Sequence, residues 1–84
     1  MGTIPRPGDI ITLAGLTDYG KSIIENLGAD WNVLSIGPAS PDSPFENGEA
    51  IAHIAPCLNR AEGWRIIRMK NDKNFEIIFT KQIP

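Results

Sequence analysis

The sequence predicts one small α+β domain that is mostly β: five short antiparallel strands form a barrel or roll, with one short helix after the first strand and a C-terminal β-hairpin. Three observations predict this class. Short apolar runs rich in β-branched residues recur along the 84 residues, and clusters of Gly, Pro, Asn and Asp separate them. Only one segment spaces its apolar residues as a helix does. Most connections are short, which favours antiparallel neighbours.

Length and composition support a single globular domain over residues 1–84. Hydrophobic residues make up 42% of the chain and charged residues 21%, which is ordinary for a globular protein. A chain of this length buries only about 60–65% of the surface that its unfolded form exposes. We therefore expect a thin core.

The chain is expected to begin with an extended arm over residues 1–9. Pro5 and Pro7 each fix the backbone φ angle, and the dipeptide Pro7-Gly8 marks a turn. Residues 10–14 read IITLA and are predicted to form the first strand, because β-branched residues dominate them.

A helix of about ten residues is predicted next, since one face carries apolar or small residues at helical spacing. These residues are Leu16, Gly20, Ile23, Ile24 and Leu27. The side chain of Thr17 or Asp18 is suited to cap the first turn. Gly28 can adopt the left-handed conformation that commonly ends a helix.

Residues 31–36 and 49–55 are predicted to form the second and third strands. Between them lies a Pro-rich surface loop over residues 37–48, in which three prolines recur at a spacing of three. Neither a helix nor a central strand tolerates that pattern. A loop of this length in so small a domain is expected to be either functional or flexible.

The last two runs, residues 64–70 and 74–80, are predicted to pair as a C-terminal hairpin around a turn-forming Asn-Asp-Lys cluster. The expected register places Arg68 opposite Glu76 on the solvent face. The order of strands and helix resembles small barrels of the SH3-like type in architecture alone, because no motif carries the resemblance.

Localisation is predicted to be cytoplasmic. No apolar run approaches the roughly 18–20 residues that cross a bilayer, so no membrane association is expected. The N-terminus lacks the apolar stretch of a secretory signal. The chain has one cysteine, Cys57, which allows no intramolecular disulfide and is typical of a reducing compartment.

Charge is unevenly distributed along the chain, whose net charge is −2. Residues 1–57 hold two basic against seven acidic side chains, whereas residues 58–84 hold six basic against three acidic side chains. Such an asymmetry favours steered association with proteins, including a second copy of the chain.

One segment matches the phosphate-binding P-loop pattern G-x-x-x-x-G-K-[ST]. The matching residues are Gly15, Gly20, Lys21 and Ser22. In such a loop backbone N–H groups cradle phosphate, the lysine reaches the outer phosphates and the hydroxyl binds magnesium. The match makes nucleotide or phosphate binding one alternative function.

We interpret this match as coincidental. No strand ends in the second carboxylate that magnesium would need, and Asp18 would place a negative charge beside the phosphates. The apolar helical face already begins at Leu16, so residues 17–22 read as the capped start of a helix. Gly20 is then the small residue that lets the helix approach the sheet.

No enzyme, cofactor or metal site is expected. His53 and Cys57 are separated by a proline-containing segment and provide only two ligands, whereas zinc sites use three or four. A Cys–His nucleophile pair is conceivable, but a cysteine more often packs as a small hydrophobe. The acidic side chains are scattered and sit mostly at element ends.

Nucleic-acid binding is a second alternative, because strand 64–70 combines basic residues with an aromatic one. Trp64, Arg68 and Lys70 share a face of this strand, and Arg65 adds a further positive charge. Phosphate contacts and base stacking are how small barrels hold single strands. The acidic overall charge of the chain argues against this function.

The function that remains is a non-catalytic accessory module that binds a partner protein through loop 37–48 and an adjacent sheet edge. Candidate contact residues are Pro41, Asp42, Phe45, Glu46, Trp64, Arg65, Arg68 and Lys70. Trp31 and Trp64 are expected in or beside the core, and whichever one is exposed becomes the first candidate for a binding hot spot. Homodimer formation through a sheet edge is also expected.

Overall fold

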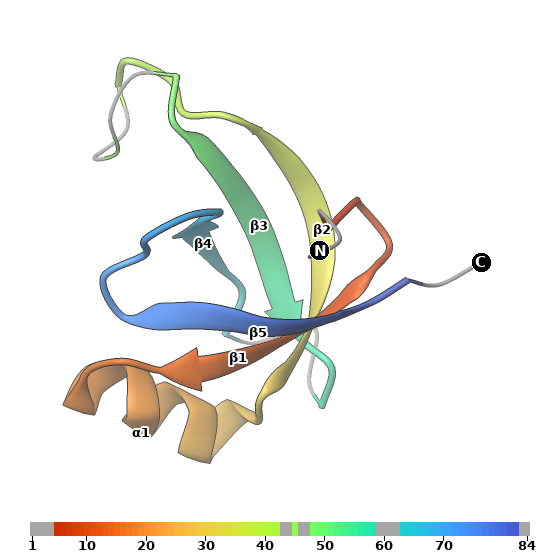
Figure 1. Cartoon of the computed structure of the whole chain (residues 1–84), viewed down its shortest axis with the longest axis vertical. Coiled ribbons are helices and arrows are strands. Elements are labelled where there is room, and N and C mark those ends of the chain that lie inside the picture. Colours follow the sequence, from red (N-terminus) through yellow and green to blue (C-terminus); the bar gives the residue numbers. More distant parts are fainter. Residues whose placement is uncertain (1–4, 43–44, 46–47, 59–62, 83–84) are drawn as a thin grey trace.

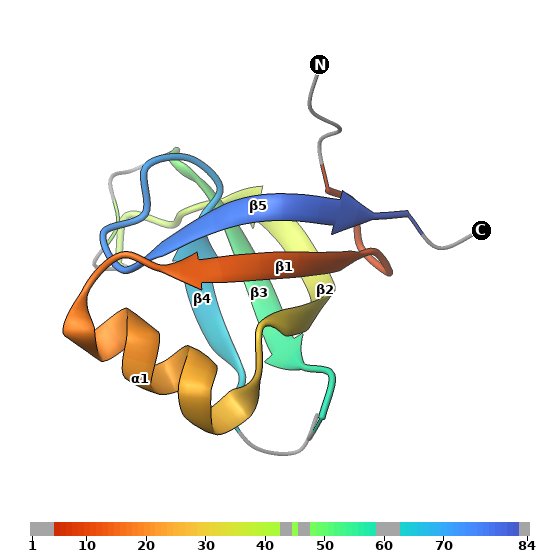
Figure 2. The same ribbon diagram turned by 60° about the horizontal axis from the view of Figure 1, so that its bottom comes forward.

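The computed structural model describes residues 5–42, 45, 48–58 and 63–82. Its elements are β1 (Ile10–Gly15), α1 (Asp18–Leu27), β2 (Asp30–Pro38), β3 (Ala50–Pro56), β4 (Arg65–Arg68) and β5 (Phe75–Lys81). The five strands form one antiparallel sheet in the order β4-β3-β2-β1-β5. Figure 1 shows β1 and β5 crossing β2 and β3 at a steep angle, and Figure 2 shows α1 along one end of the sheet. The mostly β class is confirmed.

The sheet is not closed, so the described residues do not complete a barrel. Strands β4 and β5 are its two edges: β4 pairs with β3, and β5 pairs with β1. The predicted C-terminal hairpin is therefore wrong, and so is the expected pair of Arg68 with Glu76. β5 instead aligns with the whole of β1, from Gly15 opposite Phe75 to Ile10 opposite Lys81.

The side chain of Asp72 explains why the hairpin does not form. Its carboxylate accepts hydrogen bonds from the backbone N–H groups of Arg68 at 2.9 Å, Asn74 at 3.0 Å and Phe75 at 3.2 Å. Asn71 supplies the left-handed backbone conformation of the turn, with φ 55°. Donors that could have paired β4 with β5 are thus bound to a side chain, and the chain leaves the turn toward β1.

The helix has the ends that the sequence predicts. Thr17 caps it, because its Oγ1 accepts a hydrogen bond from the N–H of Gly20 at 3.0 Å. Gly28 ends it with φ 91°, while its N–H donates to Ile24 at 2.8 Å. The backbone carbonyl of Gly28 also accepts from Nε1 of Trp31 at 3.0 Å, which joins the end of the helix to the core.

β2 is longer than its sequence predicts. It continues through Gly37 and Pro38, which lie opposite Ile51 and Ala50 of β3. The first part of the expected loop is therefore strand, and Ala39, 3% exposed, extends the pairing through hydrogen bonds to Glu49 and Gly48. Pro38 fits because it is the last residue of the strand.

The core lies between the crossing strands and the helix. Its buried members are Ile11, Leu13, Trp31, Val33, Ala52, Ile54, Ile67 and Phe75. The helix packs Ile23, Ile24 and Leu27 against them, as the helical spacing of these residues predicts. In the described part of the chain, no helix is both long and apolar enough to cross a membrane.

Candidate functional site

The outer face of β2, β3 and β4 carries the candidate site. His53 of β3 lies opposite Ser35 of β2 and Ile66 of β4. Residues directly opposite one another in an antiparallel sheet share a face. Because the neighbouring Ala52 and Ile54 are core members, these three side chains point away from the core.

Trp64, which precedes β4, is the most distinctive residue on this face. Its side chain is 58% exposed and stacks on His53, with ring centroids 6.1 Å apart and an interplanar angle of 28°. The ring of His53 is held in turn by Ser35, whose Oγ lies 3.2 Å from Nδ1. The sequence-based expectation that Trp31 lies in the core is confirmed. The ring of Trp64, in contrast, is exposed to solvent and stacks on His53.

Arg68 joins the β2–β3 connection to this face. Its Nε lies 2.9 Å from Oε1 of Glu49, and its guanidinium carbon lies 4.9 Å from the ring centre of Phe45. Arg68 is also opposite Ile51 in the β3–β4 register, so it shares the outer face with His53. We call Ser35, Phe45, His53, Trp64, Ile66 and Arg68 the Trp64 surface.

Arg65 turns to the core side of the sheet instead. It lies opposite the buried Ile54, and its guanidinium carbon is 5.8–5.9 Å from the ring centres of Tyr19, Trp31 and Phe75. Its Nη1 donates to the hydroxyl of Tyr19 at 3.1 Å. The structure therefore separates Arg65 from the other predicted contact residues of strand 64–70.

Three further predicted contact residues are exposed. Lys70 is exposed just beyond β4, and Pro41 and Asp42 are exposed in the β2–β3 connection. Glu46 lies outside the described residues. Sequence reasoning missed His53 and Glu49 as the supports of Trp64 and Arg68. The alternation of β3 places His53 on the outer face, but its neighbours depend on a register between distant strands.

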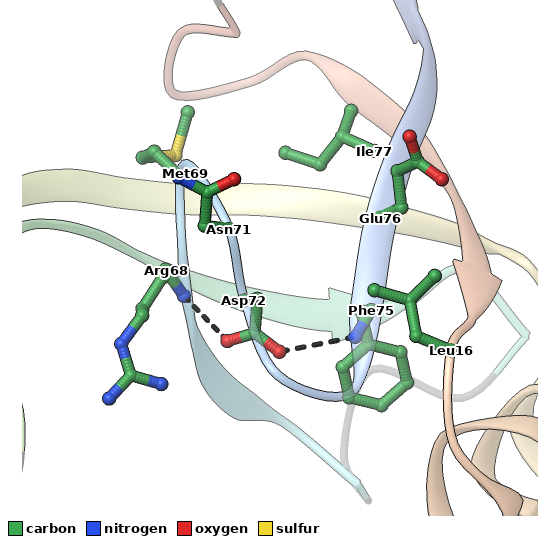
Figure 3. Close-up of a pocket in the computed structure, with 8 residues that line it drawn as sticks. All are labelled: Leu16, Arg68, Met69, Asn71, Asp72, Phe75, Glu76 and Ile77. Carbon is green, nitrogen blue, oxygen red and sulfur yellow. Dashed lines mark hydrogen bonds between the residues drawn. The ribbon is translucent and has the colours of Figure 1, made fainter.

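A pocket of about 300 Å³ occupies the seam where β4 and β5 fail to pair. It is lined by Leu16, Arg68, Met69, Asn71, Asp72, Phe75, Glu76 and Ile77. Figure 3 shows Asp72 between the backbone N–H groups of Arg68 and Phe75. Because its carboxylate already accepts three hydrogen bonds, Asp72 maintains the loop, and the pocket is a mixed apolar and polar recess beside the Trp64 surface.

The P-loop-like segment forms a capped helix start. Gly20 lies inside α1 and its N–H is bound to Thr17. The backbones of Gly15 and Lys21 abut, because a Cβ at Gly15 would lie 2.5 Å from the Lys21 nitrogen. Lys21 and Ser22 are exposed on the helix. Residues 15–22 thus form the capped start of α1, packed against the end of β1.

The structure gives His53 and Cys57 different surroundings. His53 lies within β3 and contacts Ser35 and Trp64, whereas Cys57 follows the end of β3 and is exposed. Across the residues described by the structure, no three His, Cys, Asp or Glu side chains gather as metal ligands would.

Comparisons of the chain with protein-family models, curated proteins and solved structures find no match. The geometry of the chain itself is therefore the basis for interpreting the Trp64 surface.

Proposed function

We propose that this protein is a binding module that recognises a partner protein through the Trp64 surface. The observation that carries this proposal is the 58% exposure of Trp64 while its ring is fixed against His53. Tryptophan is enriched among residues that dominate protein–protein binding energy. A ring that is already oriented loses little conformational freedom on binding.

The β2–β3 connection extends the proposed contact area. Phe45 and Glu49 both contact Arg68, so the connection lies beside the Trp64 surface, and its Pro41 and Asp42 are exposed. A platform and a flanking loop together can contact an irregular protein surface.

Protein binding is favoured over nucleic-acid binding because both arginines of β4 have intramolecular partners. Arg65 contacts three aromatic rings on the core side, and Arg68 pairs with Glu49. Both arrangements engage the guanidinium within the molecule, and the net charge of −2 adds no attraction for a phosphate chain.

Two finer assignments accompany this proposal. The strand order and the open seam between β4 and β5 support a roll of SH3-like type, since among the strands that the structure describes only the β4–β5 pairing is missing from a barrel. The single cysteine supports a cytoplasmic location, where the Cys57 thiol would stay reduced.

The test is quantitative affinity capture with three immobilised proteins: wild type, Trp64→Ala and Leu58→Ala. Leu58 is the control because it is a large apolar residue with 81% exposure that follows β3 and belongs neither to the Trp64 surface nor to β5. We expect one partner protein bound by wild type and Leu58→Ala, with affinity lowered at least about thirtyfold by Trp64→Ala. Equal capture by all three proteins would refute the proposed surface. Recovery of nucleic acid that is lost as salt rises would favour the nucleic-acid alternative.

A further inference from the structure

β5 is an edge strand that exposes two large apolar side chains near its middle. Ile78 is 58% exposed and Phe79 is 61% exposed, and among the described residues β5 pairs with β1 alone. The other edge is protected, because β4 has four residues and the N–H of Arg68 is bound to Asp72. β5 has seven residues, and an exposed apolar edge of this length is a template for pairing with another chain.

A β-bulge determines which residues of β5 share a face. Leu13 lies opposite Ile77 and Thr12 lies opposite Phe79, so Ile78 is the additional residue. On the N-terminal side of the bulge, Ile77 packs against the core. On the C-terminal side, Thr80 lies opposite the buried Ile11 and therefore faces the core.

The bulge brings two opposite charges onto one face. Glu76 precedes the core-facing Ile77, and Lys81 follows the core-facing Thr80, so both Glu76 and Lys81 lie on the outer face, where both are exposed. In a regular strand, residues five positions apart point to opposite faces. In β5 the additional residue Ile78 shifts the alternation by one position, so Glu76 and Lys81 point to the same face.

This pattern is self-complementary about a two-fold axis. When two antiparallel copies of β5 pair around an axis normal to the sheet, residues on the same face must lie opposite one another. When the axis passes between Ile78 and Phe79, Glu76 of each copy lies opposite Lys81 of the other. In the same register Ile77 lies opposite Thr80, and the four exposed apolar side chains meet at the centre.

We propose that two copies of this chain associate through antiparallel pairing of their β5 strands, which joins their sheets into one. The occupant of the edge is a second copy because the charge pattern matches itself, with both ion pairs formed at once. The Trp64 surface lies at the other end of each sheet, so the dimer would present two such surfaces and bind a multivalent partner with increased avidity.

The experiment is sedimentation equilibrium with native mass spectrometry on wild type, Glu76→Lys and Lys81→Glu. Both positions are exposed, so circular dichroism should show all three proteins equally folded. We expect a wild-type dimer, and a dissociation constant raised at least about tenfold in each single variant, because like charges then face each other. Mixing the two single variants should produce a heterodimer, since each position then faces the opposite charge.

Lys70→Glu is the matched control, because Lys70 is exposed beyond β4 at the far edge of the sheet. It should dimerise as wild type does. The proposal is overturned if the wild type remains monomeric at about 100 µM, if either single reversal leaves the dissociation constant unchanged, or if the mixed variants form no heterodimer. Loss of the dimer in Trp64→Ala would place the interface elsewhere and would also overturn it.

Discussion

Gly20 lets α1 lie directly on the backbone that leads into β5. A Cβ at this position would overlap the carbonyl oxygen of Asn74 and would lie 3.4 Å from the Cα of Gly15. The same carbonyl accepts a hydrogen bond from Leu16 at 2.8 Å, so it cannot move without loss. A methyl group at position 20 must therefore push the helix away from the sheet.

We expect Gly20→Ala to lower the free energy of unfolding by about 1–3 kcal/mol, as overpacking does. Helix propensity alone would raise stability by up to about 1 kcal/mol, so the sign of the change distinguishes the two effects. Urea denaturation measures it. Ser22→Ala is the control, because Ser22 is exposed on the same helix. Stability of Gly20→Ala equal to that of Ser22→Ala would show that the contact with Asn74 is not tight.

At the scale of elements, local signals were sufficient for the helix and insufficient for the last two strands. Thr17 and Gly28 define the ends of α1 through bonds to residues three or four positions away, and such signals can be recognised in the sequence. β5 could pair with β4 across a tight turn or with the distant strand β1, and the sequence does not show which pairing is more stable. The side-chain bonds of Asp72 decide that competition, and a turn-forming cluster in the sequence does not reveal them.

The site shows the same division. Trp64 was identifiable from its residue type and its place beside a basic strand. Its support by His53 and Ser35 depends on the register of β2 and β3, which includes a bulge between Val33 and Ser35. The inward direction of Arg65 depends on the aromatic rings that three other elements bring together, so the sequence alone placed it with the surface residues.

Removing the Asp72 carboxylate should destabilise the turn between β4 and β5. We expect Asp72→Ala to lower the free energy of unfolding by at least about 1–3 kcal/mol, because three backbone N–H groups lose their acceptor. Thermal denaturation would detect the change, and amide hydrogen exchange should quicken at Arg68 and Phe75. Lys73→Ala is the control, since Lys73 is exposed in the same turn. Unchanged exchange rates in Asp72→Ala would contradict the role of this side chain.

At the scale of the whole molecule, Arg65 covers the side of the core that the open sheet leaves uncovered. Its guanidinium lies among rings from α1, β2 and β5 and donates to the hydroxyl of Tyr19. A long aliphatic stem with a cationic end can cover apolar surface while remaining partly hydrated. One side chain from an edge strand thus links elements that the backbone bonds of β4 do not reach.

We expect Arg65→Ala to lower the free energy of unfolding by about 1–3 kcal/mol, through lost cation–π contacts and lost packing. Arg65→Met, which keeps much of the apolar stem, should recover part of that loss. The emission maximum of Trp31, measured in a Trp64→Phe background, should shift to longer wavelength in Arg65→Ala as water reaches the indole. Lys70→Ala should change neither quantity. An unaltered emission maximum in Arg65→Ala would show that other side chains cover the core.

The position of β1 between β2 and β5 has a consequence for the order of assembly. β1 is made first, yet its Gly15 pairs with Phe75, near the other end of the described chain. The contacts of β2, β3 and β4 connect strands that are neighbours in the sequence, so loop closure costs them less entropy than it costs β1 and β5. During synthesis, one side of β1 therefore stays unpaired until β5 has also left the ribosome, and the nascent chain carries an exposed strand edge until then.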